Sequence, residues 1–260
     1  MPELPEVESF KNYLRKYALK KKIIKATTYD QYLLKNISKT NLEKALQNNM
    51  ITETTRKGKY LACTLDKEGY MIFHFGMTGY FEYFKNPSQK PKFVQLLLEL
   101  EKGYFAFVCK RKLGRILLVD DAKQFFKEKK IGADALAVRE NDFIELLKKK
   151  KGNIKTALMD QTLIAGVGNE YSDEILYQAK VHPNSKTASL PDRKLSEIYY
   201  EMQAVLKYFI AHNAERGELG KYFLVENRKA GIECPGGGKI SKETISGRSS
   251  YFCPQQKLYS

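Results

Sequence analysis

The sequence predicts an α+β protein with a β-rich N-terminal half, a helical C-terminal half and a terminal β-hairpin. Short apolar or aromatic segments recur between residues 23 and 119, separated by Gly, Asp, Asn and Lys, which is typical of an antiparallel sandwich or barrel. Beyond residue 121, apolar residues recur at helical spacing. Residues 225–260 contain little that could form a core, and two Cys-Pro pairs there bracket a glycine-containing turn, which predicts a hairpin.

The composition indicates a polyanionic partner. The 260 residues include 45 Lys and Arg and 30 Asp and Glu, which gives a net charge of +15. Nucleic acid fits this charge best, with an acidic membrane surface or a lysine-rich composition without a special role as alternatives. The sequence has no run of about 18 apolar residues and no signal peptide, and its four cysteines are too few for a disulfide scaffold. We therefore expect a cytoplasmic protein with no membrane association.

Each element of the N-terminal half follows from its local pattern. Pro5 suits a first helical turn, and apolar residues then recur at helical spacing through Tyr17, which predicts a helix over residues 5–19. A second, short helix is expected at residues 41–47. Strands are expected at residues 23–29, 60–65, 70–75, 80–84, 94–100, 104–108 and 116–119. Hairpin turns are expected at residues 66–69 and 101–103.

The C-terminal half predicts four helices before the hairpin. The first begins at Asn141 or Asp142 and runs to residue 149, and the last begins near Ser189 or Pro191. The two between them span residues 152–159 and 169–179. The expected domains are residues 1–121, a linker at 122–139, a helical domain at 140–224, and a hairpin finger at 225–260.

The N-terminus offers a nucleophile. If Met1 is removed, Pro2 becomes a secondary amine, and α-amino groups titrate at roughly 7.7–8. Such an amine attacks a sugar C1′ to give an iminium ion, and Glu3 beside it is a candidate proton shuttle. The structural alternative is that Pro2 only permits removal of Met1 and Pro5 only starts a helix.

A glycine-rich junction is a candidate phosphate site. Residues 165–170, AGVGNE, follow an expected helix and not a strand, and lack the third glycine of a dinucleotide-binding motif. The glycines let the backbone approach a phosphate, Asn169 can donate to it, and Lys155 could reach the same group. A plain helix C-cap is the alternative.

Three basic or glycine-bounded segments add candidate contacts to nucleic acid. They are RKGK at residues 56–59, HFGMTG at 74–79 and KRKLGR at 110–115. A methionine or leucine on such a loop can fill the space left by an extruded base. As isolated features, the charge runs would be solvated surface and the histidine structural.

These motifs resemble the formamidopyrimidine-DNA glycosylase / endonuclease VIII family of base-excision repair enzymes. MPELPEVE, RKGKYL, HFGMTG, LMDQTLIAGVGNEY and the terminal hairpin carry the resemblance, in order over nearly the whole chain. The resemblance implies an N-terminal β-sandwich, a helix–two-turns–helix domain and a finger. It also implies a bifunctional DNA glycosylase and AP lyase that removes oxidised bases by β,δ-elimination from double-stranded DNA. We expect a monomer that associates with DNA in a bacterial-type cytoplasm.

The same resemblance assigns roles to particular residues. It makes Pro2 the nucleophile, Glu3 the general acid and base, Glu6 a further carboxylate at the sugar, and Lys59 a phosphate-binding proton donor. The remaining residues would contact DNA: His74, Lys155, Asn169 and Arg248 at the backbone, and Met77, Arg111 and Leu113 in the gap left by the extruded base.

Three departures from the family pattern matter. The finger lacks two of four expected cysteines, since Gly237 and Gln256 stand where the partners of Cys234 and Cys253 should be. Two thiolates cannot complete a tetrahedral site, so we predict a finger without zinc, no cofactor, and no disulfide between them. We expect a small cluster to hold the finger instead: Ile240, Ile245, Tyr251 and Phe252.

The other two departures concern substrate choice. Leu113 stands where the family has an aromatic wedge, and the base-capping loop at residues 215–228 is short. Formamidopyrimidines and oxidised pyrimidines are therefore the expected lesions, while 8-oxoguanine is left open. Two other functions are alternatives: a catalytically silent lesion-binding protein of the same fold, and a basic RNA- or ribosome-binding protein, which would not explain the N-terminus.

Overall fold

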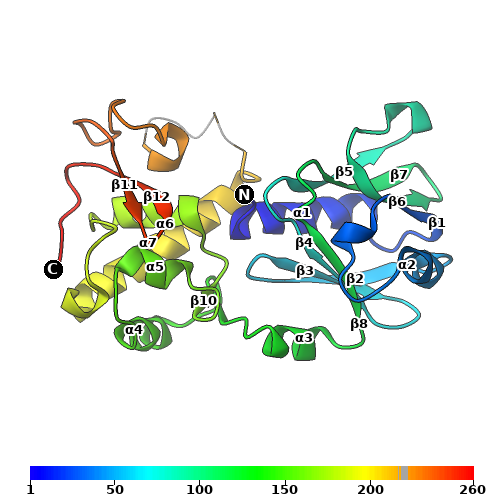
Figure 1. Ribbon diagram of the computed structural model, residues 1–260, viewed down its shortest axis with the longest axis horizontal. Helices are drawn as coiled ribbons and strands as arrows, with labels where there is room; N and C mark the ends of the chain where they lie inside the picture. Colours follow the sequence, from blue (N-terminus) through cyan, green and yellow to red (C-terminus); the bar gives the residue numbers. More distant parts are fainter. Residues whose placement is uncertain (216, 218–221) are drawn as a thin grey trace. The chain divides into compact units, whose positions relative to one another are not determined.

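The computed structural model describes residues 1–215, 217 and 222–260, and these form two compact units (Figure 1). The units are Met1–Lys130 and Ile131–Ser260. Their boundary falls inside the linker expected at residues 122–139. The first part of that linker is itself a helix, α3, Ala122–Glu128, which begins where the Asp121 side chain accepts from two backbone amides. Among the described residues, no helix has the length and apolar character needed to cross a membrane.

The first unit is a sandwich of two four-stranded antiparallel sheets, as the resemblance implied. One sheet has the order β1-β6-β7-β5 and the other β2-β3-β4-β8. The strands of the first are β1 Ile23–Thr28, β5 Gly79–Phe84, β6 Val94–Leu100 and β7 Tyr104–Cys109. Those of the second are β2 Ile51–Lys57, β3 Tyr60–Leu65, β4 Tyr70–His74 and β8 Arg115–Val119. The shorter helices are η1 Gln31–Leu33, α2 Lys39–Leu46 and η2 Pro87–Gln89.

Helix α1, Leu4–Tyr17, completes the core of the sandwich. Its Val7 and Leu14 are fully buried and belong to one hydrophobic cluster with Phe73 and Phe107, which come from the two different sheets. Burial of this apolar face against both sheets, and not helix propensity alone, holds the helix in place. The start of α1, with Glu3 as its N-cap, is thereby fixed to the sandwich.

Strand β2 was missed in the sequence. Its residues, ITETTRK, contain one buried apolar side chain, Ile51, so the pattern resembles a polar loop. Among the named strands it pairs only with β3, so it forms an edge of its sheet, where polar side chains are tolerated. The expected basic segment at residues 56–59 therefore spans the end of β2 and the two-residue turn before β3.

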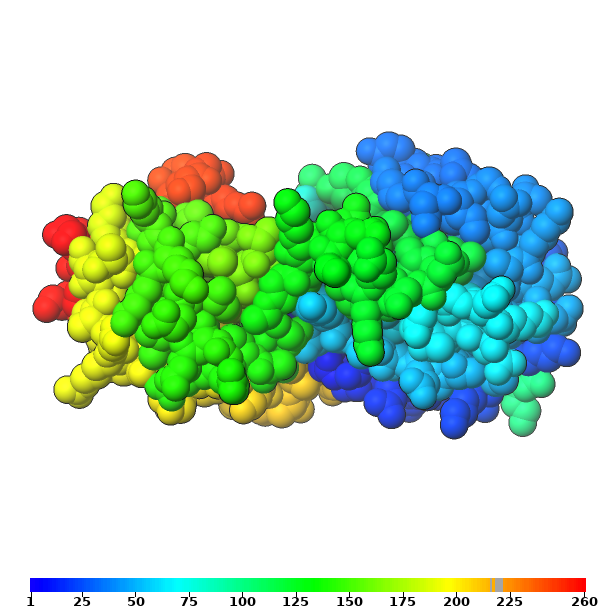
Figure 2. Space-filling model, turned by 90° about the horizontal axis from the view of Figure 1, so that it is seen from below, coloured from blue at the N-terminus to red at the C-terminus, as the bar shows by residue number. Residues whose placement is uncertain are grey.

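The second unit contains the expected helices, of which α6 begins at the expected residue and the other three begin at shifted positions. They are α4 Glu140–Lys148, α5 Ile154–Met159, α6 Asn169–Gln178 and α7 Asp192–Ala211, with η3 Thr187–Ser189 and η4 Leu224–Asn227. Neither Asn141 nor Asp142 caps α4. The N-cap is Arg139, and Asp142 instead pairs with its guanidinium at 2.7 Å. Helices α4 and α7 pack side by side, green and yellow in Figure 2.

The segment before the glycine-rich junction differs from expectation. We expected a helix directly before it, but a two-residue strand, β10 Ile164–Ala165, precedes Gly166 and pairs in parallel with β9 Ala133–Asp134. Gly166 then has a φ of +119°, a region that favours glycine. The chain turns there into α6, so the junction presents the start of a helix.

The finger is a hairpin of β11 Ser241–Ile245 and β12 Arg248–Phe252 that packs against α6. Its cluster overlaps in part with the expected one: Ile240 is buried with Leu224 and both cysteines, and Tyr251 packs against them. Phe252 instead contacts the ring of His182, with centroids 4.2 Å apart. Because a hairpin alone buries little surface, the finger depends on these contacts with the helical part of its unit.

Candidate catalytic residues and nucleic-acid interface

The first candidate residues are held at the start of α1. Glu3 is 1% exposed and forms a capping box with Glu6, in which each side chain accepts from the other's backbone amide. The amide of Glu3 donates to Oε2 of Glu6 at 2.9 Å. That amide belongs to the peptide bond that follows Pro2. Glu6 therefore fixes the backbone next to the candidate nucleophile, and Glu3 lies at the positive end of the helix dipole.

A partly buried ion pair joins the end of β2, next to the turn containing Lys59, to the same helix. Nε of Arg56 donates to Oε2 of Glu8 at 2.8 Å, and its Nη1 donates to the carbonyl of Gly58 at 3.1 Å. The Arg56 side chain is 7% exposed, and Glu8 also pairs with Lys11. Because the strand end next to the β2–β3 turn is bound to α1 in this way, Lys59 is held in the same unit as the helix that Glu3 caps.

His74 ends β4 beside Lys59 and a further cation. In the sheet it pairs with Tyr60 on one side and Arg115 on the other, and its Nδ1 accepts from the amide of Gly76 at 3.2 Å. Burial, together with smaller contributions from the charges of Lys59 and Arg115, lowers the pKa of His74 to about 4. The imidazole is therefore neutral at pH 7, with Nε2 carrying its proton.

The two loops with the expected gap-filling side chains lie against each other. The hydroxyl oxygen of Thr78 accepts from the amide of Arg111 at 3.0 Å. A Cβ on Gly76, whose φ is +61°, would lie 2.4 Å from the carbonyl carbon of Leu113. This close approach requires glycine. Met77 and Leu113, 41% and 37% exposed, thus project from adjacent loops.

Lys155 lies inside the second unit, not on its surface. Its side chain is 1% exposed, and Nζ donates to Oδ1 of Asp173 at 2.6 Å and to the carbonyl of Ser249 at 3.3 Å. Oδ2 of Asp173 accepts from Arg228 at 2.7 Å and from the amide of Tyr251 at 3.1 Å. Burial raises the pKa of Asp173, and the two cations oppose this. This differs from the exposed phosphate-binding cation that we expected, because the amine is buried in an ion pair with Asp173.

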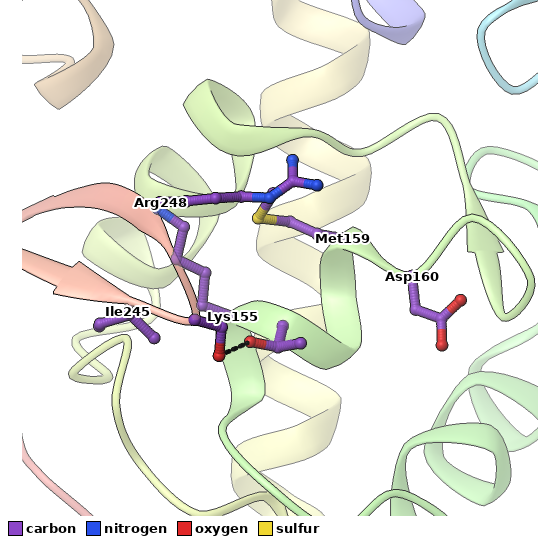
Figure 3. A pocket seen from close by; sticks show the side chains of 7 residues that line it. Lys155, Met159, Asp160, Ile245 and Arg248 are labelled. Carbon is purple, nitrogen blue, oxygen red and sulfur yellow. Dashed lines mark hydrogen bonds between the residues drawn. The ribbon is translucent and has the colours of Figure 1, made fainter.

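Asn169 and Arg248 are the other candidates in this unit. Asn169 is the first residue of α6, and its buried Oδ1 has no hydrogen-bond partner within the described part of the chain. Arg248 begins β12 and is exposed. It lines a pocket of about 280 Å³ between α5 and the finger, shared with Lys155, and extends across it toward Met159 (Figure 3). An exposed guanidinium over such a pocket suits a phosphate.

The finger cysteines differ from expectation. A disulfide joins Cys234 and Cys253, with their Cα atoms 6.0 Å apart, whereas we expected no disulfide between them. The hairpin register brings the two Cys-Pro segments together, which a count of cysteines could not show. Gln256, at a position expected for zinc-binding cysteine, accepts from the amide of Cys253 at 2.7 Å and donates to the carbonyl of Val181 at 2.8 Å.

Comparison with known proteins agrees with this geometry. Residues 1–116 match the formamidopyrimidine-DNA glycosylase N-terminal domain, and residues 131–218 match the formamidopyrimidine-DNA glycosylase H2TH domain. The chain belongs to the formamidopyrimidine-DNA glycosylase family. Members from Pelotomaculum thermopropionicum and Ureaplasma parvum are 31% and 32% identical to it, and each alignment covers 98% of both chains.

Solved structures of the family show the same fold. A complex of the Lactococcus lactis protein with DNA containing an abasic site has a TM-score of 0.89 and 30% identity, covering 98% of this chain and 99% of that one. A complex of the same protein with DNA containing N7-benzyl-Fapy-dG has a TM-score of 0.87 and 29% identity, over 97% and 98% of the two chains. These values confirm the expected family and fold.

The structure groups the expected residues by unit. The first unit holds Pro2, Glu3, Glu6, Lys59, His74, Met77, Arg111 and Leu113, and the second holds Lys155, Asn169 and Arg248. The sequence did not reveal the pairings of Arg56 with Glu8 or of Asp173 with Lys155 and Arg228. Their partners lie 48, 18 and 55 residues apart, so local pattern carries no signal of them. The short loop at residues 215–228 lies partly outside the described residues.

Proposed function

We propose that this DNA glycosylase of base-excision repair uses the amine of Pro2, after removal of Met1, to displace the damaged base. The amine nitrogen bonds to C1′ as the base leaves with a proton; the C1′–O4′ bond of the sugar then breaks, O4′ takes a proton, and an iminium ion forms between C1′ and the nitrogen. Glu3 serves as the general acid and base. The observation that carries the proposal is the capping box, because it holds the Pro2–Glu3 peptide at a rigid helix start.

The AP lyase step follows from the same intermediate. The iminium ion acidifies the C2′ proton, and its removal expels the 3′ phosphate, after which a second elimination expels the 5′ phosphate. Lys59 is proposed to bind a phosphate and to serve as a proton donor. This fits its position at a turn that Arg56 connects to α1. Hydrolysis of the iminium then restores the free amine.

We assign the remaining candidates to the DNA backbone and the extruded nucleotide. Asn169 and Arg248 bind phosphates. Lys155 contributes to phosphate binding because it lines the same pocket as Arg248. Neutral His74 contacts the backbone as an N–H donor and neutralises no phosphate. Three side chains fill the gap: Met77, Arg111 and Leu113. The partner is double-stranded DNA with damaged bases or abasic sites, as bound by the Lactococcus lactis protein, and we propose that the enzyme acts as a monomer.

The finger is proposed to work without zinc or another cofactor. Around Cys234 and Cys253 the described side chains include Gln255 and Gln256, whose amides bond to backbone groups. Elsewhere in the described chain, no cluster of three metal-binding side chains occurs. For lesions, we propose formamidopyrimidines first and oxidised pyrimidines next, with 8-oxoguanine decided by assay because the segment at 215–228 is short.

Borohydride trapping on abasic-site DNA tests the proposal. The wild-type chain should form a covalent adduct, and Pro2→Gly or a form that retains Met1 should form none. Lesion-selective binding with no adduct would instead support the silent lesion-binding protein. Excision from duplexes that each carry one lesion, compared on the same preparation, would then rank the substrates.

A further inference from the structure

Phe93 has a backbone conformation that bulky residues rarely adopt. Its φ is +64°, in the left-handed region, and its side chain is 51% exposed. Such a conformation is strained for a bulky residue and persists where the surroundings enforce it, often at functional sites. An exposed aromatic ring held in that conformation is a candidate for contact with a ligand.

Buried hydrogen bonds enforce the position of Phe93. Its carbonyl accepts from the amide of Cys109 at 3.1 Å and from Nε2 of Gln95 at 3.1 Å. Gln95 is 4% exposed and also donates to the carbonyl of Cys109 at 3.3 Å. Phe93 is therefore joined to the end of β7, where the loop with Arg111 and Leu113 begins.

The sheet order places Phe93 beside the gap-filling loops. Across β1-β6-β7-β5, one end of the sheet presents Tyr29 after β1, Phe93 before β6, Lys110 after β7 and Met77 shortly before β5. Nζ of Lys110 lies 5.8 Å from the centroid of the Phe93 ring. Phe93 thus flanks the gap-filling loops on the side away from β5, and a cation lies next to its ring.

We propose that the Phe93 ring packs on a deoxyribose of bound DNA, with Lys110 on an adjoining phosphate. This inference rests on the proposed function. Because Phe93 lies beside the gap-filling loops and not within them, it meets the backbone next to the point where those loops enter the duplex. The apolar ring suits the sugar, and the neighbouring amine suits the phosphate.

The test is binding of the full chain to a duplex with a tetrahydrofuran abasic analogue, at several salt concentrations. Asn tolerates the left-handed region, so Phe93→Asn should raise the melting temperature by about 3 °C through relief of strain. The same variant should bind about fivefold to tenfold more weakly, with the salt slope unchanged, because an apolar contact is lost. Phe93→Tyr keeps the ring and should bind within about twofold of wild type.

Two further variants complete the design. Lys110→Gln should reduce the slope of log Kd against log salt by about one. Ile24→Ala removes an exposed apolar side chain at the other end of the same sheet. It should change neither the affinity for DNA nor the salt slope. Unchanged affinity of Phe93→Asn would overturn the inference, and so would a loss accompanied by a smaller salt slope.

Borohydride trapping of the wild-type chain on the same preparations separates this inference from the proposed function. A trapped adduct together with unchanged Phe93→Asn affinity overturns the Phe93 contact alone. Weaker binding by Phe93→Asn without any wild-type adduct supports the contact and overturns the chemistry assigned to Pro2.

Discussion

Oε2 of Glu6 accepts a hydrogen bond from the amide of Glu3 at 2.9 Å. The donor is the peptide nitrogen between the proposed nucleophile and the proposed acid, so a capping interaction also fixes the catalytic backbone. Helix formation and positioning of the amine are thereby coupled at the first turn of α1. Glu6 acts here as a positioning residue, whether or not its carboxylate also lies near the reacting sugar.

Glu6→Ala should remove this coupling. We expect the free energy of unfolding to decrease by about 1 kcal/mol, the usual value of a helix cap. We also expect a clear decrease in the single-turnover rate. Glu6→Gln keeps an oxygen acceptor and should restore most of both quantities. Thermal melting and single-turnover trapping measure the two effects. If Glu6→Gln loses as much activity as Glu6→Ala, the negative charge matters more than the hydrogen bond.

Glu3→Gln should separate the two activities. Excision of an intact damaged nucleotide needs a proton donor for the leaving base, so it should be abolished. Cleavage at a preformed abasic site omits that step and should be retained in part. Gel assays on the two substrates measure this. Wild-type excision by Glu3→Gln would remove Glu3 from its assigned role.

Asp173→Asn should loosen the finger. The carboxylate compensates the buried Lys155 and binds Arg228 and the amide of Tyr251. Removal of one partner from a buried ion pair typically costs about 3–5 kcal/mol. We expect a lower melting temperature and faster proteolysis near residues 241–252. Asp192→Asn, which breaks an exposed pair with Lys148, serves as the matched control and should have almost no effect.

His74 should make stability depend on pH. Burial lowers its folded pKa to about 4, against 6.5 in the unfolded chain, so the unfolded state binds more protons between these values. Above pH 6.5, His74 does not lower the free energy of unfolding. As the pH falls from 6.5 toward 4, its preference for protonation in the unfolded chain lowers that free energy by up to about 3 kcal/mol.

The comparison of wild type with His74→Asn isolates this contribution. Glu174, in the other unit, gives the opposite slope, because burial raises its pKa to about 7 and its stabilising contribution declines as the pH rises from 4.5. This background is the same in both proteins. The unfolding free energy of wild type minus that of His74→Asn should therefore decrease as the pH falls from 6.5 to 4. A difference that stays constant with pH would contradict the assignment.

Metal removal should leave the enzyme active. With Gly237 and Gln256 at the positions of the other two cysteines, we expect the finger to have too few ligands for zinc. Metal analysis should find well under one zinc per chain, and a chelator should change neither DNA binding nor excision. Stoichiometric zinc, or loss of activity with chelator, would show that other residues complete a site.

Local pattern in the sequence was sufficient to predict most elements and the family, while the chemistry assigned to the N-terminus stays a prediction. Strands β3 and β6 match their expected bounds because short apolar or aromatic runs separated by turn-forming and charged residues identify strands. The MPELPEVE motif identified the family, later confirmed by the comparisons. Strand β2 was missed because its edge position tolerates polar residues, so no hydrophobic pattern marks it.

By itself, the sequence determined the class of fold, the family and the candidate nucleophile, since these depend on periodicity and on contiguous motifs. Only the tertiary structure decided that Lys155 is buried against Asp173, that Arg56 joins the Lys59 turn to α1, and that Cys234 meets Cys253. Each of these contacts joins side chains from segments far apart along the chain. Packing of helices and strands brings them together, and no local pattern records which partner each charge or thiol will meet.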